Sequence, residues 1–157
     1  MTLTYARTEF INFKDGSYEW VYIDHYDLPA VDDQRALVAM IEHERFGHDY
    51  AGGDPGEDTT RHGPYWRDRI SVDSYELVEA AAAEAELRAW ATGVPHPDWV
   101  FDAMEGVYRQ LHAADRVYRL RDLGEQAQHD WGGVLFEFSE FVLIGAGTLT
   151  VVVAGLD

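Results

Sequence analysis

The sequence predicts an α+β fold, in which N-terminal and C-terminal β-hairpins supply an antiparallel sheet and about three helices pack on it. Strand-like apolar patterns near both ends flank a middle region with helical periodicity. Because strands and helices are separated along the chain, we expect the helices on one face of the sheet. No internal repeat or low-complexity linker interrupts the chain, so residues 1–157 are predicted to form a single globular domain.

The C-terminal hairpin is the most apolar part of the sequence. Two runs of β-branched and aromatic residues, 134–144 and 148–154, flank a short loop with two glycines. Along the first run the apolar side chains change parity, from Val134, Phe136 and Phe138 to Phe141 and Leu143. This change predicts a β-bulge at Ser139-Glu140, since one inserted residue would return the apolar side chains to one face.

A second hairpin is predicted near the N-terminus. Residues 8–13 and 17–25 are strand-like, and Lys14-Asp15-Gly16 between them contains an Asp-Gly pair, which favours positive φ. The apolar residues of the second strand have both parities, with Trp20 and Tyr22 on one and Val21 and Ile23 on the other. This strand is therefore expected either to be covered on both faces or to present aromatic side chains outward.

Helices are predicted over residues 32–46, 73–91 and 98–120. Gly47 is expected to cap the first helix, and a capping box from Asp73 to Glu76 is expected to open the second. Residues 48–70 have no periodicity and are predicted to form a long loop.

Charge and composition restrict the partners. The chain has 157 residues, no cysteine and a formal net charge of −17, from 29 acidic and 12 basic side chains. Such a field repels phosphates and attracts basic proteins, so we expect a basic protein partner and no nucleic acid. We find no leader-like or membrane-spanning apolar run, and therefore expect a cytoplasmic protein without membrane association.

The histidines suggest a metal site as an alternative. His43 and His48 are five residues apart, whereas a zinc-protease helix needs two histidines four apart on one face. A site built from His43, His48 and His62 with loop acids would indicate a small metal-dependent enzyme or metal-binding protein. The loop acids considered for it are Asp49, Glu57 and Asp58. A polar helix end and a solvated loop explain the same residues more simply, so no cofactor or metal is expected.

Other catalytic patterns are incomplete. None of the serines lies in a Gly-x-Ser-x-Gly turn, and the glycines of residues 52–56 lack the basic residue of a phosphate-binding loop. Glu137 and Glu140 could serve as an acid–base pair, but residues three apart on a regular strand point to opposite faces. One of them is better explained as a solvent-facing charge that protects an edge strand. We therefore expect no catalytic residue and no enzyme activity.

Two short segments combine aromatic and acidic residues. Gly63 to Asp68 contains Tyr65, Trp66 and Asp68, and His129 to Gly133 contains Asp130 and Trp131. Exposed aromatic side chains beside carboxylates are typical of surfaces that anchor a basic partner. We therefore predict these five residues as a partner-binding site. The alternative is that the aromatic side chains belong to the core.

With these segments and its dispersed acids, the chain resembles the small acidic immunity proteins of bacterial polymorphic-toxin and contact-dependent growth inhibition systems. The resemblance covers size, charge, lack of cysteine and the placement of strand hairpins around helices. It implies a binding module without catalysis, which covers the cationic active site of a cognate toxin, often a nuclease, with carboxylates. A housekeeping domain of a high-salt host, which loses structure at low ionic strength, is a further alternative.

Overall fold

The computed structural model describes residues 2–14, 16–130 and 137–156. In this part of the chain, six antiparallel strands form one sheet in the order β1-β2-β8-β7-β6-β5. Their bounds are β1 Thr4–Asn12, β2 Glu19–Asp27, β5 Tyr75–Val78, β6 Arg116–Leu120, β7 Glu137–Gly145 and β8 Thr148–Leu156. The helices are α1 Asp33–Glu42, α2 Ala80–Ala91 and α3 Asp98–Ala113. A separate ribbon pairs β3 Arg61–His62 with β4 Tyr65–Trp66.

The predicted α+β fold with its two terminal hairpins is confirmed. β1 pairs with β2 and β7 pairs with β8, and the two hairpins join because β2 lies beside β8. The turn of the first hairpin uses positive φ at Lys14 (57°) and Gly16 (81°), while Asp15 lies outside the described residues. The strands β2 and β8, which come from opposite ends of the chain, therefore lie side by side in the middle of one sheet.

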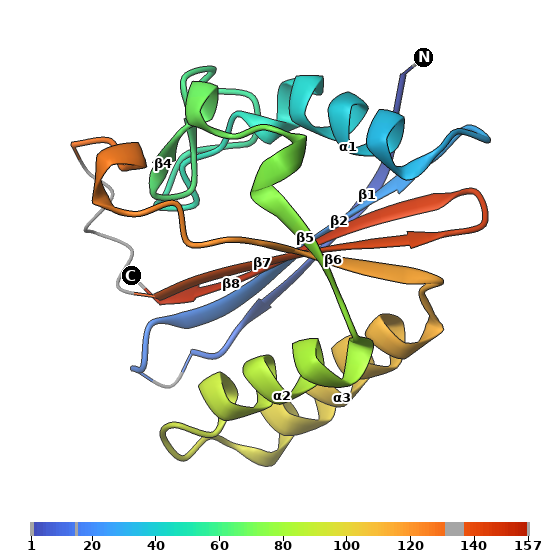
Figure 1. Cartoon of the computed structure of the whole chain (residues 1–157). Coiled ribbons are helices and arrows are strands. Elements are labelled where there is room, and N and C mark those ends of the chain that lie inside the picture. The colour runs from blue at the N-terminus through green and yellow to red at the C-terminus, as the bar shows by residue number, and fades with distance from the viewer. Residues whose placement is uncertain (1, 15, 131–136, 157) are drawn as a thin grey trace.

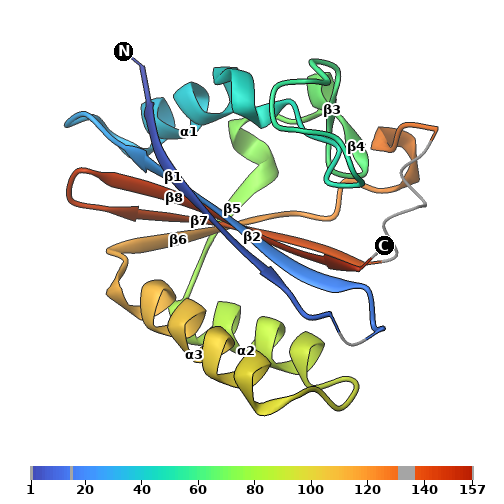
Figure 2. The same ribbon diagram turned by 180° about the vertical axis from the view of Figure 1, so that it is seen from behind.

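The helices cover both faces of the sheet, which corrects the expectation of a single covered face. Figures 1 and 2 show α1 and the long segment before β5 on one side, and α2 and α3 together on the other. One cluster of buried side chains joins α1 to its side of the sheet, and a second joins α2 and α3 to theirs. The sheet is thus the middle layer of three.

Burial on both faces also removes the need for the predicted bulge at Ser139-Glu140. β7 pairs with β8 in continuous register from Glu137–Leu156 to Gly145–Thr148. Val142 and Ile144 enter the cluster beneath α1, whereas Phe141 and Leu143 enter the cluster against α2 and α3. Both parities are apolar because both are covered. Val134 and Phe136 lie outside the described residues.

The one register shift in the β1–β2 ladder lies elsewhere, between Tyr5 and Arg7. It sits in the edge strand of the six-stranded sheet, where such irregularities are common. The outer strand therefore bends locally, while the central β2, β8 and β7 pair regularly along their whole lengths.

The first helix begins as predicted and ends early. Asp32 is its N-cap, and its side chain accepts a hydrogen bond from Arg35 N at 2.8 Å. The helix stops at Glu42, and a separate 3-10 turn, Glu44–Phe46, follows. Gly47 has a φ of −71°, so it does not supply the left-handed cap that the sequence predicts.

Two other helix predictions are wrong at one end. Residues predicted to open the second helix form a 3-10 turn, Val72–Ser74, and strand β5, and α2 starts only at Ala80. The third helix ends at Ala113, because the residues that follow form β6 between β5 and β7. Pairing on both sides of β6 outweighs the local helical pattern, since Val117 and Leu120 are buried there.

Candidate binding surface

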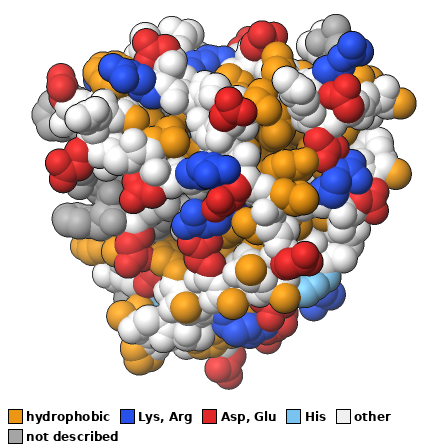
Figure 3. Space-filling model, viewed as in Figure 1, with side chains coloured by type: hydrophobic (Ala, Val, Ile, Leu, Met, Phe, Trp, Pro, Cys, Tyr) orange, Lys and Arg blue, Asp and Glu red, His pale blue; other side chains and the backbone are white. Residues whose placement is uncertain are grey.

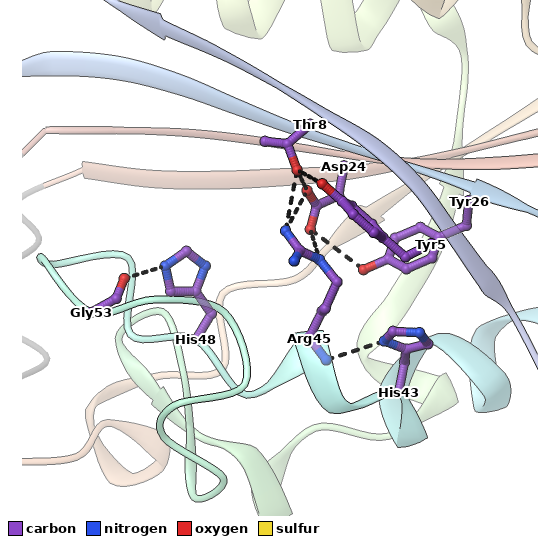
Figure 4. Close-up of polar contacts among 8 residues, drawn as sticks. All are labelled: Tyr5, Thr8, Asp24, Tyr26, His43, Arg45, His48 and Gly53. Atoms are coloured by element: carbon purple, nitrogen blue, oxygen red, sulfur yellow. Dashed lines mark hydrogen bonds and ion pairs between the residues drawn. The ribbon is translucent and has the colours of Figure 1, made fainter.

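The segment from His43 to Trp66 lies over the α1 face of the sheet, and a buried ion pair holds its start. Arg45 donates from Nε to Asp24 Oδ2 and from Nη2 to Asp24 Oδ1, and Figure 4 shows these contacts. Both distances are 3.1 Å. Thr8 Oγ1 donates to the same carboxylate at 2.5 Å, and the guanidinium carbon lies 3.8 Å from the centre of the Tyr5 ring. Asp24 is therefore fully engaged inside the protein and holds the segment to β2.

A second buried group holds the end of the segment. His62 Nε2 is hydrogen-bonded to one carboxylate oxygen of Glu140 on β7, and the hydroxyl of Tyr75 donates to the other. His62 Nδ1 donates to the carbonyl of Phe46 at 2.6 Å, and the two rings are stacked with centroids 3.7 Å apart. Glu140 and His62 are each 1% exposed, so no substrate reaches them in this conformation.

The two glutamates considered for acid–base chemistry project to opposite faces of the sheet. Glu140 is enclosed beneath the segment, while Glu137 is exposed, as strand alternation requires for residues three apart. Glu137 fits the expected solvent-facing charge. It lies on β7 outside residues 141–144, which pair with β6, so the described ladders pair this position with β8 alone and the charge sits at a locally open strand edge.

The three histidines of the alternative metal site all form hydrogen bonds within the fold. His43 Nδ1 accepts from Arg45 N at 3.1 Å, and His48 Nε2 donates to the carbonyl of Gly53 at 2.9 Å. Burial lowers the pKa of both rings, which favours their neutral forms. Across residues 2–14, 16–130 and 137–156, no three metal-binding side chains come together.

The two aromatic–acidic segments predicted from the sequence are brought together. Tyr65 forms an isolated β-bridge with Gln128, and His129 N donates to Pro64 O at 3.2 Å. His129 Nε2 also donates to Gly63 O at 2.7 Å, and its ring packs edge-on against Trp66. The segment around Tyr65 thus lies beside the segment around His129. The sequence alone does not reveal this proximity.

The predicted binding residues differ in the solvent exposure of their side chains. Tyr65 is 7% exposed and its hydroxyl accepts from Leu123 N at 3.3 Å, so for this ring the core interpretation holds. Trp66 is half-buried, whereas Asp68 and Asp130 are exposed. Trp131 lies outside the described residues. Trp66, Asp68 and Asp130 therefore remain available to a partner.

Trp66 and Asp68 line a hollow of about 750 Å³ with Glu42, Thr59, Thr60 and Arg67, which we call the Trp66 hollow. Arg67 does not pair with a carboxylate there. Its Nη2 donates to the carbonyls of Ile41 and His43 at 2.7 and 2.9 Å, at the end of α1. Burial lowers the pKa of this guanidinium. Its charge thus serves the helix end.

A neighbouring hollow of about 360 Å³ shares Thr59 and is lined by Asp49, Gly53, Asp54, Glu57 and Asp58; we call it the acidic hollow. Asp49 Oδ1 accepts from Ala51 N and Gly53 N, and Glu57 accepts from Asp54 N, so backbone donors fix these carboxylates. Among the described residues, only Asp58 of the four acids forms an ion pair, with Arg61 at 3.5 Å.

Acidic side chains elsewhere are spread out. Figure 3 shows them scattered over one whole face of the molecule among apolar and basic groups, without a single dominant patch. The two adjoining hollows are distinctive because they combine concave shape with carboxylates from one continuous segment. The sequence analysis considered Asp49, Glu57 and Asp58 as possible metal ligands and predicted Asp68 as a partner-binding residue, but it did not predict the shared surface.

No family model, curated protein or solved structure matches this chain. None of the helices in the described residues is both long and apolar enough to span a membrane. The protein is thus a three-layer α+β protein with an acidic concave surface on the α1 side of its sheet.

Proposed function

We propose that this chain is a non-catalytic acidic protein that binds and neutralises a basic partner, in the manner of an immunity protein and its cognate toxin. The observation that carries the proposal is the meeting of the Trp66 hollow and the acidic hollow at Thr59. Together they are lined by six carboxylates, from Glu42, Asp49, Asp54, Glu57, Asp58 and Asp68.

Charge and shape support a protein ligand at this surface. Lys and Arg side chains of a basic partner are attracted by the net charge of −17 and meet carboxylates already held by backbone donors. Trp66 adds an amphipathic ring at the edge, which is a common anchor at interfaces. A nuclease with a basic phosphate-binding face would be complementary to this surface.

The absence of catalysis is part of the proposal. Three of the buried polar side chains, Asp24, His62 and Glu140, are hydrogen-bonded within the protein and hold the segment that forms the surface. We place the protein in the cytoplasm, where it would meet a toxin after entry. Metal analysis of untagged protein tests the metal-binding alternative, which predicts a stoichiometric ion.

The test is capture from the host lysate at low and moderate salt, followed by growth rescue. We expect one basic protein in near-equal amount, released as salt rises, and toxic when expressed without this chain. If nothing is retained at low salt, or if the captured protein is harmless and unaffected by this chain, the proposal fails.

Two triple variants of equal net charge localise the surface. One neutralises the acidic hollow with Asp49→Asn, Asp54→Asn and Glu57→Gln. The matched control is Asp98→Asn, Asp102→Asn and Asp115→Asn, three exposed acids on and just after α3 on the other side of the sheet. Both remove three charges, so the long-range field changes equally. We expect about tenfold weaker binding for the first set alone; equal losses would reject the surface.

A further inference from the structure

A third hollow, of about 320 Å³, opens between the β1–β2 hairpin and residues 48–53. We call it the aromatic hollow, because its walls include Phe10, Tyr18, Trp20, Tyr22, His48 and Tyr50. It lies on the α1 side of the sheet, since Trp20 and Tyr22 belong to the cluster beneath α1. Neither the resemblance nor the predicted site includes it.

The rings of this hollow are presented in several orientations. Trp20 and Tyr50 are nearly parallel, with centroids 6.0 Å apart and an interplanar angle of 8°. Tyr22 stands at 83° to Tyr50 with its centroid 5.6 Å away. Tyr18 and Phe10 are 71% and 55% exposed, so two large ring surfaces are open to solvent at this hollow.

The backbone conformation of two of these tyrosines, Tyr18 and Tyr50, also points to a role for their side chains. Tyr18 and Tyr50 have φ values of 62° and 57°, in the left-handed region that glycine adopts most readily. The only other non-glycine residue with positive φ in the described part of the chain is Lys14, in the adjoining turn. Two strained tyrosines in one hollow point to a use for their rings.

The walls favour a cation. None of the lining side chains is basic, and burial lowers the pKa of His48, which keeps that ring neutral. Gly53 belongs to both the aromatic hollow and the acidic hollow, so the hollow that Asp49 and Asp54 line adjoins the aromatic one. Aromatic faces attract cations through their quadrupole, and neighbouring carboxylates add to this attraction.

We propose that the aromatic hollow binds an arginine side chain of the basic partner. A guanidinium is flat and weakly hydrated, so it stacks on Trp and Tyr rings better than an ammonium does. Its charge then lies beside the carboxylates of the acidic hollow. This inference rests on the proposed function for the source of the arginine, but the site itself can be tested without a partner.

The test is an NMR titration of the whole protein with the peptide acetyl-Gly-Arg-Gly-amide. The control peptide replaces arginine with citrulline, which has nearly the same shape and no charge. We expect saturable shifts of the Phe10, Tyr18 and Tyr22 rings, which are the exposed or partly exposed rings of the hollow, with the arginine peptide only. Equal shifts with both peptides, or shifts confined to residues 54–58, would overturn the proposal.

Two surface variants and one control complete the experiment. Tyr18→Asn keeps a residue that tolerates positive φ, and Phe10→Thr keeps a strand-forming residue. Each variant should lower the affinity for the arginine peptide by about threefold or more, which corresponds to the free energy of an exposed cation–π contact. Trp99→Gln on α3, where the ring is 47% exposed, should have no effect. An equal loss in all three would also overturn the proposal.

The outcome is separable from that of the proposed function. Arginine-specific shifts without any captured partner would establish the site and reject the immunity function. A captured toxin that the acidic-hollow variant releases, together with no arginine-specific shift, would support the function and reject this site.

Discussion

His62 and Glu140, which are 78 positions apart in the sequence, form a hydrogen-bonded pair in the interior of the protein. The pair joins β3 to β7, while Arg45 and Asp24 join the start of the same segment to β2. Both carboxylates project from the α1 face of the sheet. Residues 43–66 have little regular secondary structure, so these two contacts anchor the segment that forms the acidic surface to the sheet.

Removing one partner of the His62 pair should destabilise the fold strongly. Glu140→Ala leaves the imidazole of His62 and the hydroxyl of Tyr75 buried without their acceptor. We expect a loss of about 3–5 kcal/mol in the free energy of unfolding, measured by urea denaturation. Glu137→Ala, on the same strand but exposed, should change it by less than about 0.5 kcal/mol.

Replacing both partners distinguishes pairing from packing. In the double variant His62→Phe with Glu140→Leu, neither member of the pair is left buried without its partner, although the Tyr75 hydroxyl still needs an acceptor and the Phe46 carbonyl a donor. We expect this variant to recover part of the stability lost in Glu140→Ala. A double variant less stable than Glu140→Ala would show that the shape of the pair matters more than its polar contact.

Gly63 should tolerate no side chain. Its φ is 55°, and a Cβ there would lie 2.5 Å from Cζ of Phe138. We expect Gly63→Ala to cost about 2–4 kcal/mol, from left-handed strain together with overpacking. The matched variant Gly124→Ala has a φ of 79° and no atom within 4 Å, so strain alone should cost about 1 kcal/mol. Equal unfolding midpoints for the two variants would contradict the predicted clash.

The contribution of Asp33 to stability should depend on pH. Burial acts to raise its pKa, but hydrogen bonds from Arg116 and Tyr118, each at 2.6 Å, outweigh burial and hold the pKa below its ordinary value. Because the folded-state pKa is depressed, the ionised carboxylate contributes its full stabilisation at pH values above the ordinary pKa of about 3.9. This stabilisation is lost as the pH falls through the folded-state pKa.

The comparison is between Asp33→Asn and wild type, by chemical denaturation from pH 7 to pH 2.5. The stability difference should be largest at neutral pH and shrink towards the acid end. Asp98→Asn is the control, because Asp98 also begins a helix but forms no ion pair within the described residues. A difference for Asp33→Asn that stays constant with pH would show that its carboxylate charge is not responsible.

Low ionic strength separates partner binding from adaptation to salt. If the acids serve a partner, the far-ultraviolet circular dichroism spectrum should be the same at 10 mM and 500 mM salt. The buried contacts of Asp24 and Glu140 are screened little by solvent ions, so they support the fold at both concentrations. A spectrum of unfolded chain at 10 mM would favour the high-salt host instead.

The positions of the strands β5 and β6 show where sequence patterns stop being informative. Both are short, of four and five residues, and each adjoins a helix whose periodicity extends over it. Their strand conformation depends on each other and on β7, through backbone hydrogen bonds between distant segments. The local sequence around each strand does not indicate which distant segment it pairs with.

The sequence by itself determined the α+β class, both terminal hairpins, the start of α1 at Asp32 and the acidic character, because strand alternation, turn chemistry, capping and charge act over a few residues. Only the tertiary structure decided that both sheet faces are covered, that β2 lies beside β8, and that Trp66 meets His129. It also decided that Glu140 is buried against His62. Those outcomes depend on which distant surfaces exclude water from one another, and that is settled when the whole chain packs.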